Sequence, residues 1–165
     1  VKIKPYRGWV EKKYLWGIFI LVIIGVITFQ TNTQKPINSP EDLVLLGNQM
    51  GVEGNHLEAS KAFKNSIRID PYYIPAYLGL GISYGNLQKN KEAIEVLTEG
   101  IKLNQAHSYV PQMQMSIANI LYKKMNNKIA AVEYVKKALQ NFTYQGNIAG
   151  VALAGQKLQQ LESVS

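Results

Sequence analysis

Few side chains in this 165-residue sequence are of the types that carry catalytic or metal chemistry. There is no cysteine, so thiolate catalysis, thiolate metal sites and disulfides are excluded. The two histidines, His56 and His107, lie far apart, and neither is paired with an acid or a cysteine in a metal-ligand pattern. No nucleophile, base and orienting acid are grouped together. We therefore expect no enzyme activity, no metal, no cofactor and no small-molecule substrate.

Two short motifs have simple alternative explanations. Gly79, Gly81 and Gly85 resemble a glycine-rich nucleotide-binding loop. The residues read Gly-x-Gly-x-x-Tyr, however, so the motif's third glycine is missing, and no strand precedes it. Close packing between helices explains these glycines better. The tripeptide Asn141-Phe142-Thr143 matches a glycosylation acceptor, which matters only in a eukaryotic secretory setting.

The net charge of +7 is concentrated at the N-terminus. Within the first thirteen residues a net charge of +4 arises from five basic residues and Glu11; the basic residues are Lys2, Lys4, Arg7, Lys12 and Lys13. The remaining +3 is spread over the rest of the chain, without the dense basic stripe of a nucleic-acid-binding protein. We therefore expect no nucleic-acid partner.

Two stretches of the chain, Leu46 to Pro71 and Leu80 to Gln105, repeat each other at a spacing of 34 residues. Five small or apolar positions correspond: Leu46, Gly47, Met50, Ala59 and Phe63 in the first copy, and Leu80, Gly81, Tyr84, Ala93 and Leu97 in the second. The spacing resembles that of the tetratricopeptide (TPR) repeat, a pair of antiparallel helices. That resemblance implies an all-α helical solenoid whose glycines and alanines let the helices approach closely.

A third copy is less regular. In our alignment Ala118 to Tyr122 correspond to Leu80 to Tyr84, which places Asn119 at the position of Gly81. The step from Ala93 to Ala131 is 38 residues, so we place four extra residues between helices, in Asn104 to Pro111. Thr143 replaces the helix-stopping Pro71 of the first copy.

The C-terminal segment predicts a helix that covers the exposed apolar face of the last repeat. Its apolar stripe comprises Ile148, Val151, Ala152, Leu158 and Leu161. The predicted organisation is a basic segment at 1–13, a transmembrane signal anchor at 14–29, a linker at 30–39, three TPR repeats at 40–145 and a capping helix at 146–165.

The anchor is predicted from sixteen uncharged, mostly apolar residues, which span roughly 24 Å as a helix. Residues suited to the membrane interface flank it: Trp9, Lys12, Lys13, Tyr14 and Trp16. A cleaved signal peptide is the alternative, although no small A-x-A cleavage site follows. The basic N-terminal flank predicts a single-pass membrane protein with a cytoplasmic N-terminus and periplasmic or lumenal repeats. The alternative orientation places the repeats on the cytoplasmic or stromal face.

The resemblance implies that the first helix of each repeat lines a concave groove. The groove positions of this sequence are Val44, Asn48, Val52, Leu78, Ile82, Asn86, Ser116, Ile120, Lys123 and Lys124. These residues form an apolar groove with a basic end, suited to an amphipathic helix or an extended apolar segment. Only Asn48 matches the carboxylate clamp with which some TPR proteins read chaperone C-termini, so that function is not expected.

We expect a membrane-anchored scaffold that binds a subunit of a larger membrane complex as an assembly or stabilising factor. Its plan is similar to that of the photosystem I assembly TPR proteins of cyanobacteria and plastids. The alternative is a permanent accessory subunit of a photosynthetic, respiratory, secretion or pilus complex. The expected partners are protein subunits and the lipid bilayer.

Overall fold

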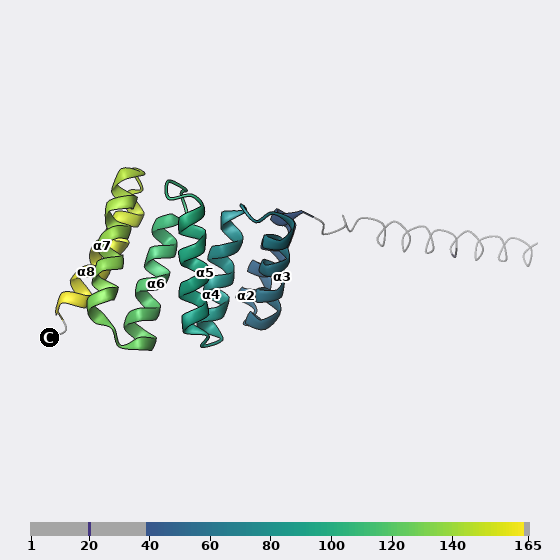
Figure 1. Ribbon diagram of the computed structural model, residues 1–165, viewed down its shortest axis with the longest axis horizontal. Coiled ribbons are helices and arrows are strands. Elements are labelled where there is room, and N and C mark those ends of the chain that lie inside the picture. Colours follow the sequence, from purple (N-terminus) through teal and green to yellow (C-terminus); the bar gives the residue numbers. More distant parts are fainter. Residues whose placement is uncertain (1–19, 21–38, 164–165) are drawn as a thin grey trace, which may run out of the picture. The chain divides into compact units, whose positions relative to one another are not determined.

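The computed structural model describes residues 20 and 39–163. Every element in 39–163 is an α-helix, which confirms the predicted all-α solenoid (Figure 1). The helices are α2 (Pro40–Val52), α3 (His56–Ile69), α4 (Ile74–Asn86), α5 (Asn90–Leu103), α6 (Val110–Met125), α7 (Lys128–Tyr144) and α8 (Ile148–Ser163). The side chain of Ser39 caps the first of them by accepting a hydrogen bond from the backbone N–H of Asp42, at 3.1 Å.

The helices form successive antiparallel hairpins that stack side by side. The pairs α2–α3, α4–α5 and α6–α7 pack closely, and each pair also contacts the next (Figure 1). The turn within each pair has one residue with positive φ: Gly54, Gln88 or Asn126. A fourth turn of this kind, at Gly146, joins α7 to α8, so α8 folds back on α7.

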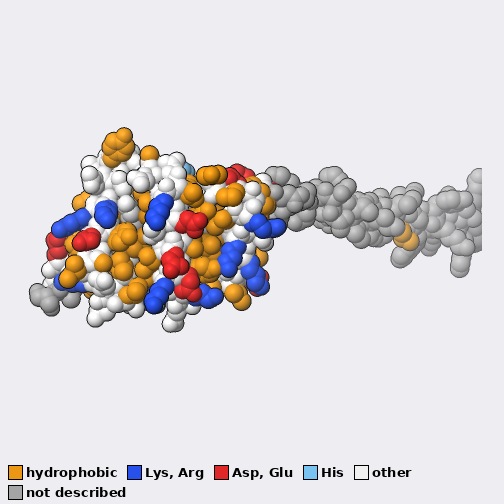
Figure 2. Space-filling view, viewed as in Figure 1, with side chains coloured by type: hydrophobic (Ala, Val, Ile, Leu, Met, Phe, Trp, Pro, Cys, Tyr) orange, Lys and Arg blue, Asp and Glu red, His pale blue; other side chains and the backbone are white. Residues whose placement is uncertain are grey.

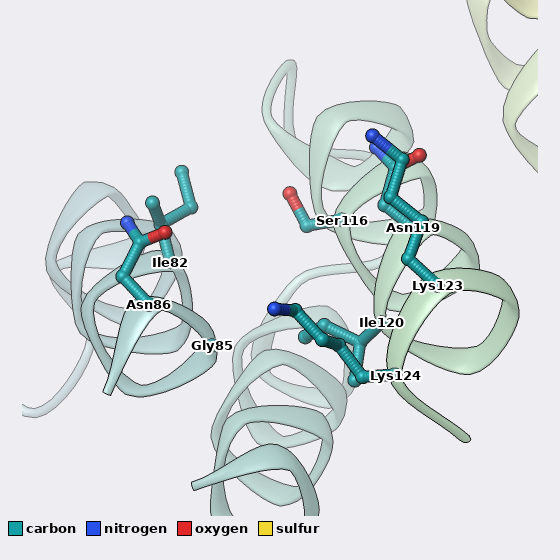
Figure 3. A pocket seen from close by; sticks show the side chains of 8 residues that line it. All are labelled: Ile82, Gly85, Asn86, Ser116, Asn119, Ile120, Lys123 and Lys124. Carbon is teal, nitrogen blue, oxygen red and sulfur yellow. The ribbon is translucent and has the colours of Figure 1, made fainter. Parts of the chain in front are cut away.

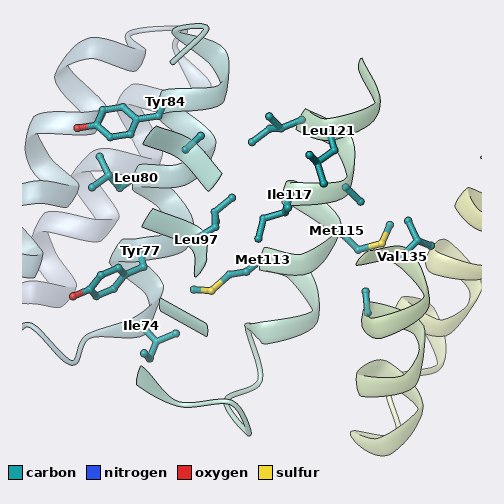
Figure 4. Close-up of a cluster of buried hydrophobic side chains, with 14 of the residues drawn as sticks. Ile74, Tyr77, Leu80, Tyr84, Leu97, Met113, Met115, Ile117, Leu121 and Val135 are labelled. Atoms are coloured by element: carbon teal, nitrogen blue, oxygen red, sulfur yellow. The ribbon is translucent and has the colours of Figure 1, made fainter. Parts of the chain in front are cut away.

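The core runs through the middle of the stack, where both helices of each pair meet the next pair. Leu97, Met113 and Ile117 are fully buried there, and Leu80 and Tyr84 join them as the repeat pattern predicts (Figure 4). Close approach depends on glycine: a Cβ added to Gly81 would overlap the side chain of Leu97. Helix packing therefore accounts for this glycine, as predicted.

The third repeat has a different register from the one that we predicted. The burial pattern of α4 recurs in α6 after 37 residues, so Ala118, which is fully buried, stands at the position of Gly81. Asn119 is exposed and corresponds to Ile82. The pattern of α5 recurs in α7 after 38 residues. Three of the four extra residues thus precede the matched part of α6, and the fourth lies in the α6–α7 turn.

The ends of the second helices follow from their sequences. α3 ends at Ile69, directly before Asp70-Pro71, because a proline disfavours helical backbone at the preceding residue. α7 has Thr143 at the corresponding place and continues to Tyr144. The Thr143 hydroxyl donates to the Leu139 carbonyl at 2.8 Å, so this residue is accommodated within the helix.

The predicted packing stripe of α8 is partly wrong. Leu161 is buried, but Ile148 is 85% exposed and Ala152 is also exposed. Gly150 and Ala154 are buried instead, and a Cβ on Gly150 would overlap the Phe142 ring. α8 packs through small residues because the bulky partner side chain comes from α7.

The predicted localisation is contradicted. Among residues 20 and 39–163, no helix is both long and apolar enough to cross a bilayer. With the exception of Ile20, the predicted span 14–29 lies outside the described residues, as do the predicted interface residues Trp9, Lys12, Lys13, Tyr14 and Trp16.

Candidate functional site

Two neighbouring hollows lie along the first helices of the three repeats. The α2–α4 hollow has a volume of about 320 Å³ and is lined by Gly47, Asn48, Gly51, Val52, His56, Phe63, Gly79, Ile82, Ser83 and Asn86. The α4–α6 hollow has a volume of about 250 Å³ and is lined by Ile82, Gly85, Asn86, Ser116, Asn119, Ile120, Lys123 and Lys124. Both include Ile82 and Asn86, so together they form one continuous surface, which we call the groove.

The shared residues lie on α4, between the two hollows. Figure 3 shows Ile82 and Asn86 on one side of the α4–α6 hollow, with Ser116 and Asn119 of α6 opposite. Ile82 is 47% exposed, although its neighbours Gly81 and Ser83 are buried. An apolar side chain held half in solvent at the centre of a groove leaves apolar area for a ligand to cover.

Glycines shape the α2–α4 hollow. Gly47 and Gly79 face the Phe63 ring, and a Cβ on Gly47 would lie 2.8 Å from it. Gly51 has open space where a Cβ would project. The α2 side of the hollow is therefore open beside Gly51, and Val52, which is 91% exposed, forms its outer rim.

The structure distributes the predicted groove residues between the two hollows and the core. Eight line the groove: Asn48, Val52, Ile82, Asn86, Ser116, Ile120, Lys123 and Lys124. Val44 is buried in the hydrophobic core, and Leu78 is partly buried against it, so neither lines a hollow. Ile120 is only 8% exposed and forms the floor of the α4–α6 hollow.

Sequence reasoning missed Asn119, which lines the α4–α6 hollow. The predicted alignment of the third repeat is one residue out of register and therefore places Asn119 at the packed position of Gly81. The signal for the correct alignment is Ala118, since a small residue is required where the helices approach closely. In that alignment Asn48, Ile82 and Asn119 occupy the same position of successive first helices, and all three are exposed.

The α6 end of the groove is positively charged. Lys123 and Lys124 line the hollow, and no Asp or Glu lines either hollow. Nearby, burial and then the charge of Lys123 lower the pKa of Lys157 on α8. The Lys157 Nζ also lies 5.2 Å from the centre of the Tyr122 ring, a cation–π contact. This end of the groove is therefore suited to an acidic group.

The described residues show no grouping suited to binding a metal. No cluster of three or more His, Asp or Glu side chains that could hold a metal occurs in this part of the chain. His56 lines the α2–α4 hollow, whereas His107 lies in the α5–α6 loop with its ring stacked on Tyr109. Asn141, the glycosylation candidate, lies in α7, and its side-chain amide donates to Gln114 at 3.0 Å.

The helical hairpins of the groove match a known repeat. Residues 74–107, which contain α4 and α5, match the family model described as "Tetratricopeptide repeat". The chain carries a tetratricopeptide repeat. No curated protein matches the chain. Similar solved structures include other TPR proteins, in agreement with the resemblance seen in the sequence.

Three solved structures illustrate the shared fold. PcrH from Pseudomonas aeruginosa is 22% identical, with a TM-score of 0.68 over 75% of this chain and 92% of that one. A type III secretion complex from Aeromonas hydrophila is 24% identical, with a TM-score of 0.67 over 75% and 81%. The Yersinia enterocolitica type III secretion chaperone SycD, in complex with a peptide of the translocator YopD, is 19% identical, with a TM-score of 0.66 over 78% and 97%. At these identities the likeness establishes the fold.

Proposed function

We propose that the TPR unit is a protein-binding scaffold that holds an apolar segment of another protein in its groove and so acts as an assembly or stabilising factor for that protein. The observation that carries the proposal is the half-exposed Ile82 at the centre of a continuous groove, which also has the exposed Val52 at one rim and two lysines at the α6 end. The SycD structure, which has the same fold and contains a translocator peptide, lends support.

The lining specifies the chemistry of the bound segment. Apolar side chains of the segment would cover Ile82 and Val52, and the amides of Asn48, Asn86 and Asn119 can both donate to and accept from its backbone. An acidic side chain at one end would lie near Lys123 and Lys124. We therefore expect an apolar segment that is flanked on one side by acidic residues.

Copurification with Ile82 variants tests the proposal. The tagged protein would be purified from its native source, and the copurifying proteins identified and counted. Changing Ile82 to Asp should remove the bound protein without changing helical content, because a carboxylate would be buried against the apolar segment. Ile129→Asp is the matched control, since Ile129 is 79% exposed on α7 and lines neither hollow. Equal recovery by both variants would refute groove binding.

Charge reversal tests the basic end separately. In Lys123→Glu/Lys124→Glu, affinity for the identified segment should fall about tenfold, because two exposed ion pairs of up to about 1 kcal/mol each are replaced by repulsion. The loss should shrink at high salt, since exposed charges are screened. Unchanged affinity in the reversed variant would show that the segment has no acidic end.

The molar ratio distinguishes two forms of the function. Recovery only with an incomplete complex, below one copy per complex, indicates an assembly factor. Recovery at a fixed ratio with a mature complex would instead indicate the alternative, a permanent accessory subunit.

A further inference from the structure

A further hollow lies at the ends of the repeats, away from the groove residues, where the α3–α4 and α5–α6 loops meet. It has a volume of about 420 Å³ and is lined by Tyr72, Tyr73, Ile74, Pro75, Leu103, Asn104, His107, Ser108 and Tyr109. We call it the tyrosine hollow. Tyr72 is 75% exposed and Tyr109 is 39% exposed. Both side chains therefore present the largely apolar surface of a tyrosine to solvent. Tyrosine is strongly enriched among residues that dominate binding interfaces.

The first of the two loops is fixed by its own hydrogen bonds. Asp70 accepts from the backbone N–H groups of both tyrosines, through its side chain for Tyr72 at 2.9 Å and through its carbonyl for Tyr73 at 3.1 Å. The hydroxyl of buried Tyr77 donates to the Pro71 carbonyl at 2.8 Å. The rings of Tyr72 and Tyr73 are therefore held on an ordered backbone.

The second loop is fixed in a similar way. The backbone N–H of Tyr109 donates to Nδ1 of His107 at 3.2 Å, and the two rings stack with their centres 5.5 Å apart. The side chain of Gln145 donates to the His107 carbonyl at 3.3 Å, which ties the loop to the end of α7. A surface that is already ordered loses little conformational entropy when it binds a ligand.

The tyrosine hollow lacks the lysines of the groove. No Lys, Arg, Asp or Glu lines it, but acidic side chains act on its tyrosines. Burial raises the pKa of Tyr73, and the negative charges of Glu41 and Asp70 raise it further. Burial and the negative charges of Glu99 and Asp70 do the same for Tyr77 beneath it. Acidic side chains therefore lie close enough to act on Tyr73 and Tyr77, although none of them lines the hollow.

We propose that the tyrosine hollow binds a proline-rich segment of a partner protein that carries an arginine. Proline rings pack on the faces of tyrosine and histidine, and an extended proline-rich segment loses little conformational entropy on binding. Proline also lacks a backbone N–H, so it leaves no donor unsatisfied where it packs on the tyrosine rings. An arginine guanidinium both stacks on tyrosine and pairs with Glu41 or Asp70.

Calorimetry with a synthetic peptide tests this inference. The probe is a ten-residue proline-rich peptide with one terminal arginine and blocked ends, titrated into the whole chain. Tyr72→Ala and Tyr109→Ala should each weaken binding about tenfold or more. Tyr72→Phe should bind like the original protein because it keeps the ring. Tyr144→Ala is the matched control: Tyr144 is 86% exposed but lines a different hollow.

A double variant that lacks both acids tests the acidic contribution. Glu41→Gln/Asp70→Asn removes both charges, while the side-chain amide oxygen introduced at position 70 can still accept the Tyr72 N–H. This variant should weaken binding of the arginine peptide about fivefold, and it should not change binding of a peptide with glutamine in place of arginine.

Three results would overturn the inference: no binding of the arginine peptide at millimolar concentration, equal affinity in all tyrosine variants, or a peptide with alanine in place of every proline that binds equally well. Ile82→Asp, which blocks the groove, should leave peptide binding unchanged. Failure of the groove proposal and failure of this one are thus separable.

Discussion

The register of the third repeat makes a sharp prediction for two adjacent residues of α6. The structure places Ala118 in the close contact between helices and Asn119 on the groove surface. Replacing each in turn by leucine adds an apolar side chain to the same helix at consecutive positions. Only the first change should destabilise the fold.

The magnitude follows from the space available at each position. Ala118 is fully buried, and at the equivalent position in α4 even one added carbon on Gly81 would overlap Leu97. The three additional carbons of a leucine at 118 should therefore cost about 1–3 kcal/mol of unfolding free energy, the usual penalty for overpacking. Asn119 is exposed, so Asn119→Leu should change stability by no more than about 0.5 kcal/mol.

Urea unfolding followed by circular dichroism at 222 nm measures both effects. Ala118→Leu should lower the transition midpoint, and Asn119→Leu should leave it close to that of the original protein. The reverse outcome, a large loss for Asn119→Leu and none for Ala118→Leu, would restore the 38-residue alignment and refute the reasoning. Similar losses of stability in both variants would show that positions 118 and 119 are both packed against other residues.

Three further predictions concern the same unfolding measurement. Gly81→Ala should destabilise the fold by about 1–2 kcal/mol, because the penalty for overpacking exceeds the gain in helix propensity. Gly155→Ala has open space around the new methyl group and should stabilise the fold by about 0.5–1 kcal/mol. Equal effects of the two changes would refute the packing role of Gly81. Tyr77→Phe should cost about 1 kcal/mol by removing the hydrogen bond to Pro71. Folding raises the pKa of Tyr77 above 10.0, so the neutral hydroxyl contributes to the free energy of unfolding. This contribution should be present below pH 10 and lost as the pH rises through the folded-state pKa, and Tyr77→Phe should lack this loss. Ser39→Ala should cost about 1 kcal/mol by uncapping α2, and Ser39→Asp, which can still cap, should not.

The first two repeats were predictable because each required residue occurs at its place. Gly81 and Ala93 repeat Gly47 and Ala59, so spacing determined both the helix pairs and their buried faces. The third copy lacks the glycine, and its extra residues divide between two connections. A single offset could not align both of its helices.

The groove was predictable to the extent that its residues lie on one face of a regular helix. Ile82 and Asn86 are one helical turn apart on α4, and the spacing of the repeats brings α6 alongside. The sequence predicts Val44 in the groove, but the structure buries it, because helix periodicity alone does not show how far the packed face of α2 extends. The tyrosine hollow was not predictable, since Tyr72 and Tyr109 belong to irregular loops that meet only after the hairpins stack.

The two candidate surfaces are chemically separate although they share one helix. α4 carries no charged residue; its N-terminal Ile74 lines the tyrosine hollow and its C-terminal Asn86 lines the groove. A helix of this length separates its ends by about 18 Å, which exceeds the Debye length of about 8 Å at physiological salt. The acids near one end and the lysines near the other therefore act on different ligands. An acidic-ended segment in the groove and an arginine-bearing segment at the tyrosine hollow should bind at once, so the unit can bridge two partners.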